Sequence, residues 1–563
     1  MALLPNFPTY YAILMGGFFL ALAINFSLNR NLRSFQATAW RPLLLGSWAR
    51  RVWLLAGLAP VLPTTATAQA IPVTVQAGDP KLQISKHIYG HFAEHLGRCI
   101  YDGFWVDDKL NVSKQGRIRM DVVEALRKIK VPNLRWPGGC FADTYHWRDG
   151  IGPTAQRPKM LNMWWGNSVE DNSFGTHEFL ELCQLLGTEP YLAANVGSGT
   201  VQEMAGWMEY LNANDDTPLV LERRKNGHPE PYKVSWWGIG NESWGCGGHM
   251  TPEYYADVYK RYATFAHNYP ASPPLKKIVS GANGDDANWT EVCMKKIPLS
   301  QMWGLTLHYY TLPTGDWKKK GPATGFDEAQ YFSTLQNCLK MDGIVTRHAA
   351  IMDKYDPEKK VALLVDEWGV WTDVEPGTEP GFLYQQNSLR DALVAGTTLN
   401  IFNNHCDRVR GANLAQAVNV LQAVILTDKE KMLLTPTYHV FDLYKVHQDA
   451  QLLPLQFTSP DYVLGNQKIP ALNASASKDA SGAVHISLVN LDTKKALKLE
   501  TALPGVTWKN VSGRILTSAK INDYNSFDNP NKVKLANFTG AKKRGSNLTV
   551  ELPPQSVVML ELK

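Results

Sequence analysis

Two glutamates occupy corresponding places in two similar segments of the chain. Glu242 follows Asn241 in the segment GNESWGCGG, and Glu367 lies in VDEWGVW. Each follows a short run of apolar residues, so each is expected at the end of a strand. Two carboxyl groups at one site suit the hydrolysis of a glycosidic bond. One protonates the leaving oxygen, and the other attacks or assists at the anomeric carbon.

Eight short apolar segments, each followed by a helical pattern, extend from about residue 88 to residue 410. The segments end in residues 87–95, 131–139, 190–199, 234–243, 277–286, 303–310, 361–369 and 398–405. Between the fourth and fifth, Thr251 and Pro252 predict the start of a helix. Eight such units predict an α/β fold, a closed (β/α)8 TIM barrel, whose active site lies where the strands end. Glu242 and Glu367 would face one another across its mouth.

The pattern changes after about residue 440 to short alternating runs separated by Gly, Asn and Pro, such as residues 485–489 and 558–562. This pattern predicts a C-terminal antiparallel β-sandwich of jelly-roll type. Residues 71–85 alternate in the same way. We therefore expect a presequence at 1–70, an N-terminal strand segment at 71–87 that joins the sandwich, the catalytic barrel at 88–440 and the sandwich at 441–563.

Seven motifs follow one another between about His87 and Leu426. They are GHFAEHLGRCIYDGFWV, LRWPGGCFADTYHWRDGIGP, NSFGTHEF, GNESWGCGG, HYYT, VDEWGVW and NLAQAVNVLQ. In this order they resemble the motifs of glycoside hydrolase family 51, the α-L-arabinofuranosidases. The resemblance implies a retaining, exo-acting enzyme that releases terminal arabinofuranosyl units from arabinoxylan, arabinan or derived oligosaccharides. It implies no cofactor and no metal.

The resemblance also assigns roles to individual residues. Glu242 would be the general acid/base and Glu367 the nucleophile, and Asn241 would hydrogen-bond the sugar 2-OH. The charge of Glu367 is expected to be the main cause of a raised pKa at Glu242. Glu94, Asn195 and Gln416 would surround the furanose, and His308 and Tyr310 would flank the nucleophile. Apart from these assignments, Trp368 is expected near the pocket because an aromatic ring can stack on a sugar, and Cys140 is expected beside the adjacent subsite. Cys140 stands where other members of the family often have Asn.

Several alternatives stay open on the sequence alone. An endo-β-glucanase or a β-xylosidase could use the same barrel and carboxylate pair, because the fold does not determine the sugar. A carbohydrate-binding protein without turnover is an alternative from another class. Each glutamate could also be an ordinary rim residue in a salt bridge, and Asn195 could be a turn former.

The segment from His91 to His95 matches H-x-x-E-H, a pattern that also occurs in zinc peptidases. Zinc binding by that motif needs a helix, in which residues four apart share one face. Gly90 precedes the segment and Gly97 follows it, and the first barrel strand is expected to end here. We therefore disfavour a metal site. The seven cysteines are scattered and odd in number, which predicts neither a disulfide framework nor a zinc cluster.

The first 70 residues contain five Arg and no Lys, Asp or Glu, so the net charge of +5 becomes zero without them. A neutral chain favours neither nucleic acid nor a membrane surface as a partner. Two features predict a signal peptide and therefore a secreted or periplasmic protein. They are two Arg followed by an apolar run at residues 50–59, and small residues before Ala70. An anchor at residues 10–26 is the alternative. The family resemblance also suggests a homo-oligomer, a trimer or a hexamer.

Overall fold

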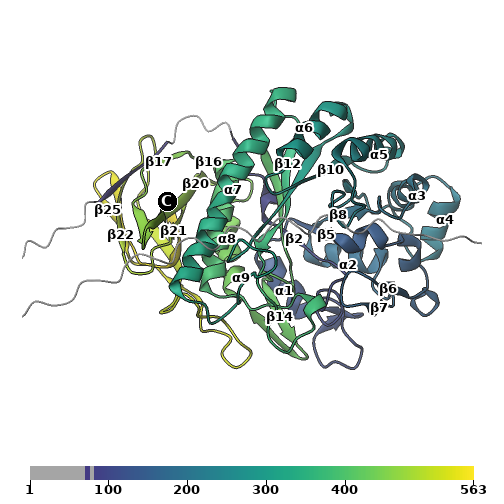
Figure 1. The fold of residues 1–563 in the computed structure, drawn as a ribbon, viewed down its shortest axis with the longest axis horizontal. Helices are drawn as coiled ribbons and strands as arrows, with labels where there is room; N and C mark the ends of the chain where they lie inside the picture. Colours follow the sequence, from purple (N-terminus) through teal and green to yellow (C-terminus); the bar gives the residue numbers. More distant parts are fainter. Residues whose placement is uncertain (1–69, 77–81) are drawn as a thin grey trace, which may run out of the picture. The chain divides into compact units, whose positions relative to one another are not determined.

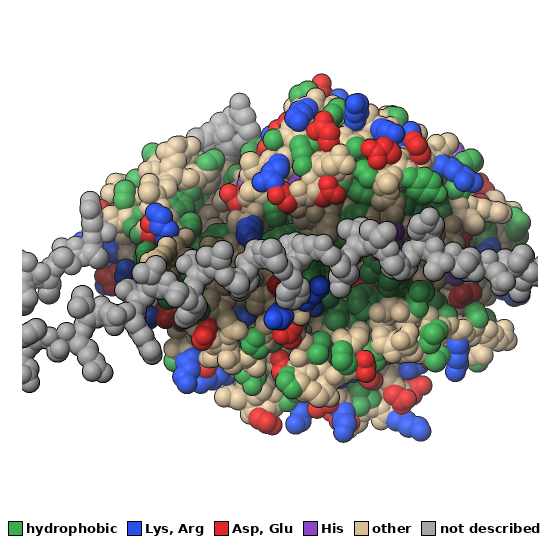
Figure 2. Space-filling view, viewed as in Figure 1, with side chains coloured by type: hydrophobic (Ala, Val, Ile, Leu, Met, Phe, Trp, Pro, Cys, Tyr) green, Lys and Arg blue, Asp and Glu red, His purple; other side chains and the backbone are tan. Residues whose placement is uncertain are grey.

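The computed structural model describes residues 70–76 and 82–563. The predicted anchor at residues 10–26 and the apolar run at 50–59 lie outside these residues. No helix in the described part of the chain is long and apolar enough to span a membrane. On the face shown in Figure 2, Lys and Arg side chains are interspersed with Asp and Glu rather than gathered in one field.

Eight strands close into a barrel in which every neighbouring pair is parallel (Figure 1). In chain order they are β2 (Gly90–Phe92), β5 (Asn133–Trp136), β8 (Glu189–Ala194), β9 (Trp236–Ile239), β10 (Lys276–Asn283), β11 (Gly304–Thr311), β12 (Ala362–Val370) and β13 (Val409–Leu414). The predicted fold class is confirmed. Strand β9, the fourth of the barrel, ends just before Glu242. Strand β12, the seventh, contains Glu367.

The last predicted strand was wrong. Residues 398–405 belong mainly to helix α8 (Leu389–Asn404), and the eighth strand is β13. Residues 389–403 are all buried, because α8 packs against the barrel on one side and the C-terminal sheets on the other. A helix buried on every face has no polar side, so its apolar run cannot be told from a strand by periodicity.

Helices cover the outside of the barrel, as the ribbon in Figure 1 shows. They are α1 (Met120–Lys128), α2 (Thr176–Leu186), α3 (Val201–Asn212), α4 (Pro218–Lys225), α5 (Pro252–Phe265), α6 (Ala287–Lys296), α7 (Glu328–Tyr355), α8 and α9 (Pro436–Tyr444). Helix α5 begins as its sequence predicts: the side chain of Thr251 accepts a hydrogen bond from the backbone N–H of Tyr254, and Pro252 occupies the first turn.

The C-terminal part contains two large sheets and a two-stranded hairpin of β18 (Asp461–Leu464) and β19 (Gln467–Pro470). One large sheet has the order β17-β1-β22-β26-β25 and the other β16-β20-β21-β27-β23-β24. Their strands are β16 (Gln451–Leu452), β17 (Leu455–Phe457), β20 (Leu472–Lys478), β21 (Val484–Asn490), β22 (Leu497–Ala502), β23 (Val511–Thr517), β24 (Leu535–Asn537), β25 (Ala541–Arg544), β26 (Asn547–Leu552) and β27 (Ser556–Leu562). Strand β1 (Ile71–Val75) lies between β17 and β22, so the N-terminal strand pairs within this part of the chain. The pair of β1 with β22 is parallel, and the other pairs in both sheets are antiparallel.

Candidate active site

Glu242 and Glu367 reach the same space from two different backbone settings. Glu367 lies within β12, where its backbone is in register with His308 of β11. Glu242 lies in a tight turn after β9 with φ +40°, in the left-handed region that costs a residue with a side chain free energy. The turn is held by the carbonyl of Glu242, which accepts the N–H groups of Gly245 at 2.7 Å and Gly247 at 3.1 Å.

The two carboxyl groups are close together. One oxygen of Glu242, one oxygen of Glu367 and one ring nitrogen of His308 all lie within 4.8 Å of one another. Retaining glycosidases hold their two carboxyl groups about 5–5.5 Å apart, whereas inverting enzymes need about 6.5–9.5 Å to admit a water molecule. The separation in this site corresponds to the retaining arrangement.

The carboxylate of Glu367 is buried and held at both oxygens. Arg135, from β5, donates to its Oε1 at 2.8 Å, and the hydroxyl of Tyr310 donates to its Oε2 at 2.8 Å. The two donors fix the positions of both carboxylate oxygens. The second Nη of Arg135 donates to the side-chain oxygen of Asn241 at 2.6 Å. One guanidinium group therefore positions Glu367 and the residue beside Glu242 together.

His308 bridges two carboxyl groups. Its Nδ1 lies 2.9 Å from Oε1 of Glu242, and its Nε2 lies 3.1 Å from Oδ1 of Asp366. Burial lowers the pKa of His308, but the charge of Glu367 and the bonds to Asp366 and Glu242 outweigh it and raise the pKa to about 10. The ring is thus an imidazolium that donates from both nitrogens. Because Oε1 of Glu242 accepts one of these bonds, a proton on Glu242 sits on Oε2.

The pKa of Glu242 is raised above its ordinary value, as expected, but chiefly for a different reason. Burial is the largest cause, the bond from His308 opposes it, and the charge of Glu367 raises the pKa further. The sequence had suggested the charge of Glu367 as the main cause. A proton donor that works near neutral pH needs a raised pKa of this kind.

Glu94 lies on the other side of Glu367. Its Oε1 accepts the Nε1–H of Trp165 at 2.9 Å and the backbone N–H of Phe141 at 3.1 Å, and its Oε2 accepts from Gln416 at 3.0 Å. Burial, and then the charge of Glu367, raise the pKa of Glu94 to about 7. The side-chain oxygen of Gln416 is buried and has no partner within the protein. It is therefore free to accept a hydrogen bond from a sugar hydroxyl.

Asn241 is held through both its side chain and its backbone. Its side-chain oxygen accepts from Arg135, and its backbone N–H donates to Asp143 at 3.2 Å. Its side-chain nitrogen has one weak contact, with the sulfur of Cys246 at 3.9 Å. This nitrogen remains available to donate to a hydroxyl group.

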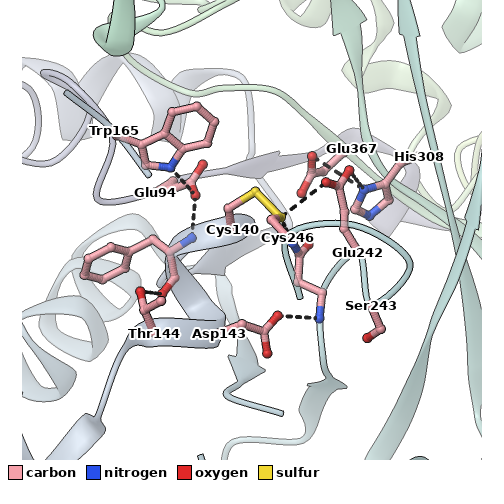
Figure 3. Close-up of a disulfide and its surroundings, with 12 residues drawn as sticks. Glu94, Cys140, Asp143, Thr144, Trp165, Glu242, Ser243, Cys246, His308 and Glu367 are labelled. Atoms are coloured by element: carbon pink, nitrogen blue, oxygen red, sulfur yellow. Dashed lines mark hydrogen bonds and ion pairs between the residues drawn. A yellow bond between two sulfur atoms is a disulfide. The ribbon is translucent and has the colours of Figure 1, made fainter. Parts of the chain in front are cut away.

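A disulfide joins the loops that follow β5 and β9. Cys140 is bonded to Cys246, and the Sγ of Cys246 lies 3.5 Å from Oε2 of Glu242 (Figure 3). A disulfide sulfur carries no proton, so this contact places a weak acceptor beside the acid. The sequence placed Cys140 near the sugar site but did not reveal its partner.

Two predicted binding residues are engaged elsewhere. Asn195 donates to Tyr145 and Ser198, and its side-chain oxygen accepts the N–H groups of Ser198 and Gly199, so its amide holds a turn. Trp368 is buried against Phe402 and Phe441. Successive side chains of a strand point to opposite faces, and the residue after Glu367 therefore points into the core. The expected sugar contact of Trp368 is wrong.

Sequence reasoning missed two charged residues, Arg135 and Asp366. Both are at least 98% buried. Asp366 accepts from Tyr191 at 2.8 Å and lies 3.4 Å from Nε of Arg135. The signal was present in the motifs: an Arg between Leu134 and Trp136, in an apolar strand, requires a buried anion.

The H-x-x-E-H segment does not form a helix. His91 lies in β2, where it packs on Phe441, and His95 comes after the strand and bonds Glu170 at 2.7 Å. Two other groups of three donors lie close enough to share an ion in the described part of the chain. They are Glu242, His308 and Glu367, and Glu242 with the two bridged cysteines. In the first group, the ring of His308 is bonded at both nitrogens, to Glu242 and to Asp366.

A parallel barrel with one glutamate just after its fourth strand and another within its seventh, held at this separation, defines a retaining glycoside hydrolase. The sequence matches the Alpha-L-arabinofuranosidase 1 domain at residues 125–326 and the Alpha-L-arabinofuranosidase C-terminal domain at residues 366–556. An intracellular exo-alpha-L-arabinofuranosidase of Bacteroides ovatus is 52% identical over 87% of this chain and 95% of its own. The chain belongs to glycoside hydrolase family 51 and is an α-L-arabinofuranosidase.

Solved structures agree with this assignment. The family 51 arabinofuranosidase of Xanthomonas axonopodis pv. citri has a TM-score of 0.86 and 50% identity, covering 88% of this chain and 100% of its own. The α-L-arabinofuranosidase of Thermotoga maritima, solved as an arabinose complex, has a TM-score of 0.76 and 33% identity, covering 87% and 99%. These likenesses do not favour an endo-glucanase, a xylosidase or a binding protein without turnover.

The prediction of a secreted or periplasmic protein is contradicted by the Bacteroides ovatus relative, which is named intracellular. That prediction rested on an apolar run after two Arg and on small residues before Ala70. Both features are short and compositional, and Ala-rich apolar runs arise for reasons other than export.

Proposed function

We propose that this enzyme is a retaining exo-α-L-arabinofuranosidase in which Glu367 is the nucleophile and Glu242 the general acid/base. The proposal rests on one observation: two neighbouring carboxyl groups have different surroundings. Glu367 receives hydrogen bonds from a guanidinium and a phenol, which fix both of its oxygens, whereas burial raises the pKa of Glu242.

In the first step, Glu367 attacks the anomeric carbon while the proton on Oε2 of Glu242 passes to the leaving oxygen. The products are an arabinosyl-enzyme ester and a free alcohol. During attack the negative charge leaves Glu367, and this removes one cause of the raised pKa of Glu242. Arg135 and Tyr310 hold the two oxygens of Glu367 in place as the charge is lost.

In the second step, Glu242 takes a proton from water and the resulting hydroxide attacks the anomeric carbon, which restores Glu367. The lowered pKa of Glu242 in the intermediate favours this role as a base. His308 keeps Oε1 occupied in both steps, so the proton leaves and returns at Oε2. Net retention follows from two inversions at the same carbon.

A single arabinofuranosyl ring would be held by groups whose hydrogen-bonding capacity is not used within the protein. These are the side-chain nitrogen of Asn241 and the side-chain oxygen of Gln416, whose side-chain nitrogen donates to Glu94. The Bacteroides ovatus relative is named an exo-acting enzyme, which supports action on a terminal unit here.

A cavity of about 670 Å³ adjoins this site through Tyr310. Trp317, which is 51% exposed, lies on its wall and makes an edge contact with Tyr310. Asn283, Asp285, Lys340 and Arg347 add polar groups. An aromatic face with polar neighbours suits sugar rings, so we propose that the cavity receives the oligosaccharide or polysaccharide to which the arabinose is attached.

The two roles are separable by experiment. Glu242→Ala should retain the first step on aryl α-L-arabinofuranosides with good leaving groups, which need no proton, whereas Glu367→Ala should lose both steps. Aryl β-D-xylosides and cellulose should not be hydrolysed. Equal residual rates in the two variants on activated substrates would contradict the roles. The expected trimer or hexamer stays a prediction, which light scattering of the purified full chain would test.

A further inference from the structure

The disulfide at the mouth of the barrel differs from the other cysteines of the described chain. Cys140 and Cys246 are partly exposed, whereas the remaining five cysteines are all buried. The bridge connects residues 106 apart in sequence, and their Cα atoms lie 5.4 Å apart. A reductant in solution therefore has access to this disulfide.

The bridge also touches the acid/base. Figure 3 shows it lying beside Glu242, on the side away from His308. The Sγ of Cys246 is 3.5 Å from Oε2 of Glu242, and the two sulfurs and one carboxylate oxygen lie within 4.8 Å of one another. Oε2 is the oxygen that carries the proton in the proposed mechanism.

Reduction would turn the disulfide into a different pair of chemical groups. A phosphine takes one oxygen from water and becomes a phosphine oxide, while the bridge gains two electrons and two protons and becomes two thiols. A thiol that binds a metal ion loses its proton, so two thiolates and one carboxylate would result. Zinc prefers sulfur at about 2.3 Å and carboxylate oxygen at about 2.0–2.2 Å in a tetrahedron, which sets the two sulfurs about 3.8 Å apart.

We propose that reduction of Cys140–Cys246 creates a binding site for Zn²⁺ whose third ligand is Glu242, and that the bound ion stops hydrolysis. Rotation of two side chains is enough to open the sulfur pair to this spacing, because their Cα atoms are already adjacent. The fourth position would be open to water. A carboxylate that binds zinc through Oε2 cannot deliver a proton to the leaving oxygen. The loss of activity rests on the proposed role of Glu242, whereas binding does not.

Inhibition is measured on the full chain with an aryl α-L-arabinofuranoside and increasing ZnCl₂, before and after reduction with a sulfur-free phosphine. Each preparation is normalised to its own zinc-free rate. Reduced wild type should be inhibited at a zinc concentration at least tenfold lower than oxidised wild type or the Cys140→Ser/Cys246→Ser variant. A chelator should restore the rate. Cys406→Ser, which changes a buried cysteine, should keep the zinc sensitivity of the reduced wild type.

Binding is measured separately with Co²⁺ in place of Zn²⁺. Reduced wild type should show a thiolate-to-cobalt charge-transfer absorption for one ion per chain, and the double serine variant should not. Equal zinc inhibition of the oxidised, reduced and double serine proteins would overturn the proposal, because the ligands would then be Glu242, His308 and Glu367 without sulfur. The proposal would also be overturned if mass spectrometry shows both thiols free and zinc still does not inhibit that protein. Stoichiometric binding without inhibition would overturn its second half.

Discussion

The Nδ1–H of His308 donates a 2.9 Å hydrogen bond to Oε1 of Glu242, and this bond leaves Oε2 as the oxygen that carries the acid proton. The same ring is bonded to Asp366 through Nε2 at 3.1 Å, so its position is set from both ends. An acid/base with one oxygen fixed and the other free has a defined direction of proton transfer.

Replacing His308 with Gln should shift the pH dependence of the reaction. The bond and charge of His308 lower the pKa of Glu242 against burial, so the variant should have a still higher pKa at Glu242. Activity falls as pH rises through that pKa, because the first step needs the protonated acid. The alkaline limb of kcat/KM should therefore move to higher pH, and the maximal rate should fall about 10–100-fold as orientation is lost.

The comparison uses an aryl arabinofuranoside with a poor leaving group, for which proton donation limits the rate. The exposed residue His267 offers a matched control, and His267→Gln should leave the profile unchanged. A limb that stays in place or moves to lower pH in His308→Gln would show that the ring does not act on Glu242.

Replacing Arg135 with Met should damage both stability and turnover. The substitution removes the guanidinium that pairs with the buried carboxylates of Glu367 and Asp366, and breaking such a buried pair costs about 3–5 kcal/mol. Chemical denaturation should show this loss, and kcat should fall at least about 100-fold. Arg148→Met removes an exposed ion pair with Glu222 and should cost about 1 kcal/mol or less. Comparable losses in the two variants would contradict the positioning role of Arg135.

Gly139 lies against the nucleophile. A Cβ added at this position would come within 2.9 Å of Oε1 of Glu367, closer than van der Waals contact allows. Gly139→Ala should therefore displace the carboxylate and lower kcat about tenfold or more. Gly206→Ala, inside helix α3, meets its nearest atoms at 3.6 Å and should keep full activity with stability equal to wild type or about 1 kcal/mol higher. Full activity of Gly139→Ala would mean that the carboxylate is not confined there.

The cavity beside Tyr310 predicts a substrate-dependent effect of Trp317→Ala. Loss of a stacking face should raise KM for arabinose-containing oligosaccharides about tenfold, at a cost of roughly 1–2 kcal/mol, and leave the KM of a small aryl arabinofuranoside nearly unchanged. Tyr254→Ala removes another exposed aromatic side chain and should change neither value. An equal rise for both substrates of Trp317→Ala would place the tryptophan at the arabinose itself.

The sequence predicted elements correctly where a clear local pattern marks them. Seven barrel strands, and the places of the two glutamates at strand ends, were predicted from apolar runs that end in polar residues. The start of helix α5 was predicted from Thr251 and Pro252. Helix α8 was missed because it is buried on every side and therefore lacks the polar face that marks most helices.

The polar connections within the site were harder to predict. Arg135 contacts residues that are 106 and 232 positions away, and Cys140 bonds a residue 106 positions away. Such pairs depend on the register of distant strands, which no local pattern records. Trp368 was expected to offer an aromatic face to the sugar, but it directly follows Glu367, and neighbours along a strand face opposite ways.

The most direct test of the central claim is the mass of the enzyme after reaction. Glu242→Ala mixed with an activated aryl α-L-arabinofuranoside should accumulate a covalent intermediate, because the leaving group needs no acid and the base for the second step is missing. Intact-protein mass spectrometry should show the addition of one arabinosyl group, and peptide mapping should place it on Glu367. An adduct on another residue, or turnover of that substrate with no adduct at any time, would contradict the assignment of Glu367 as the nucleophile.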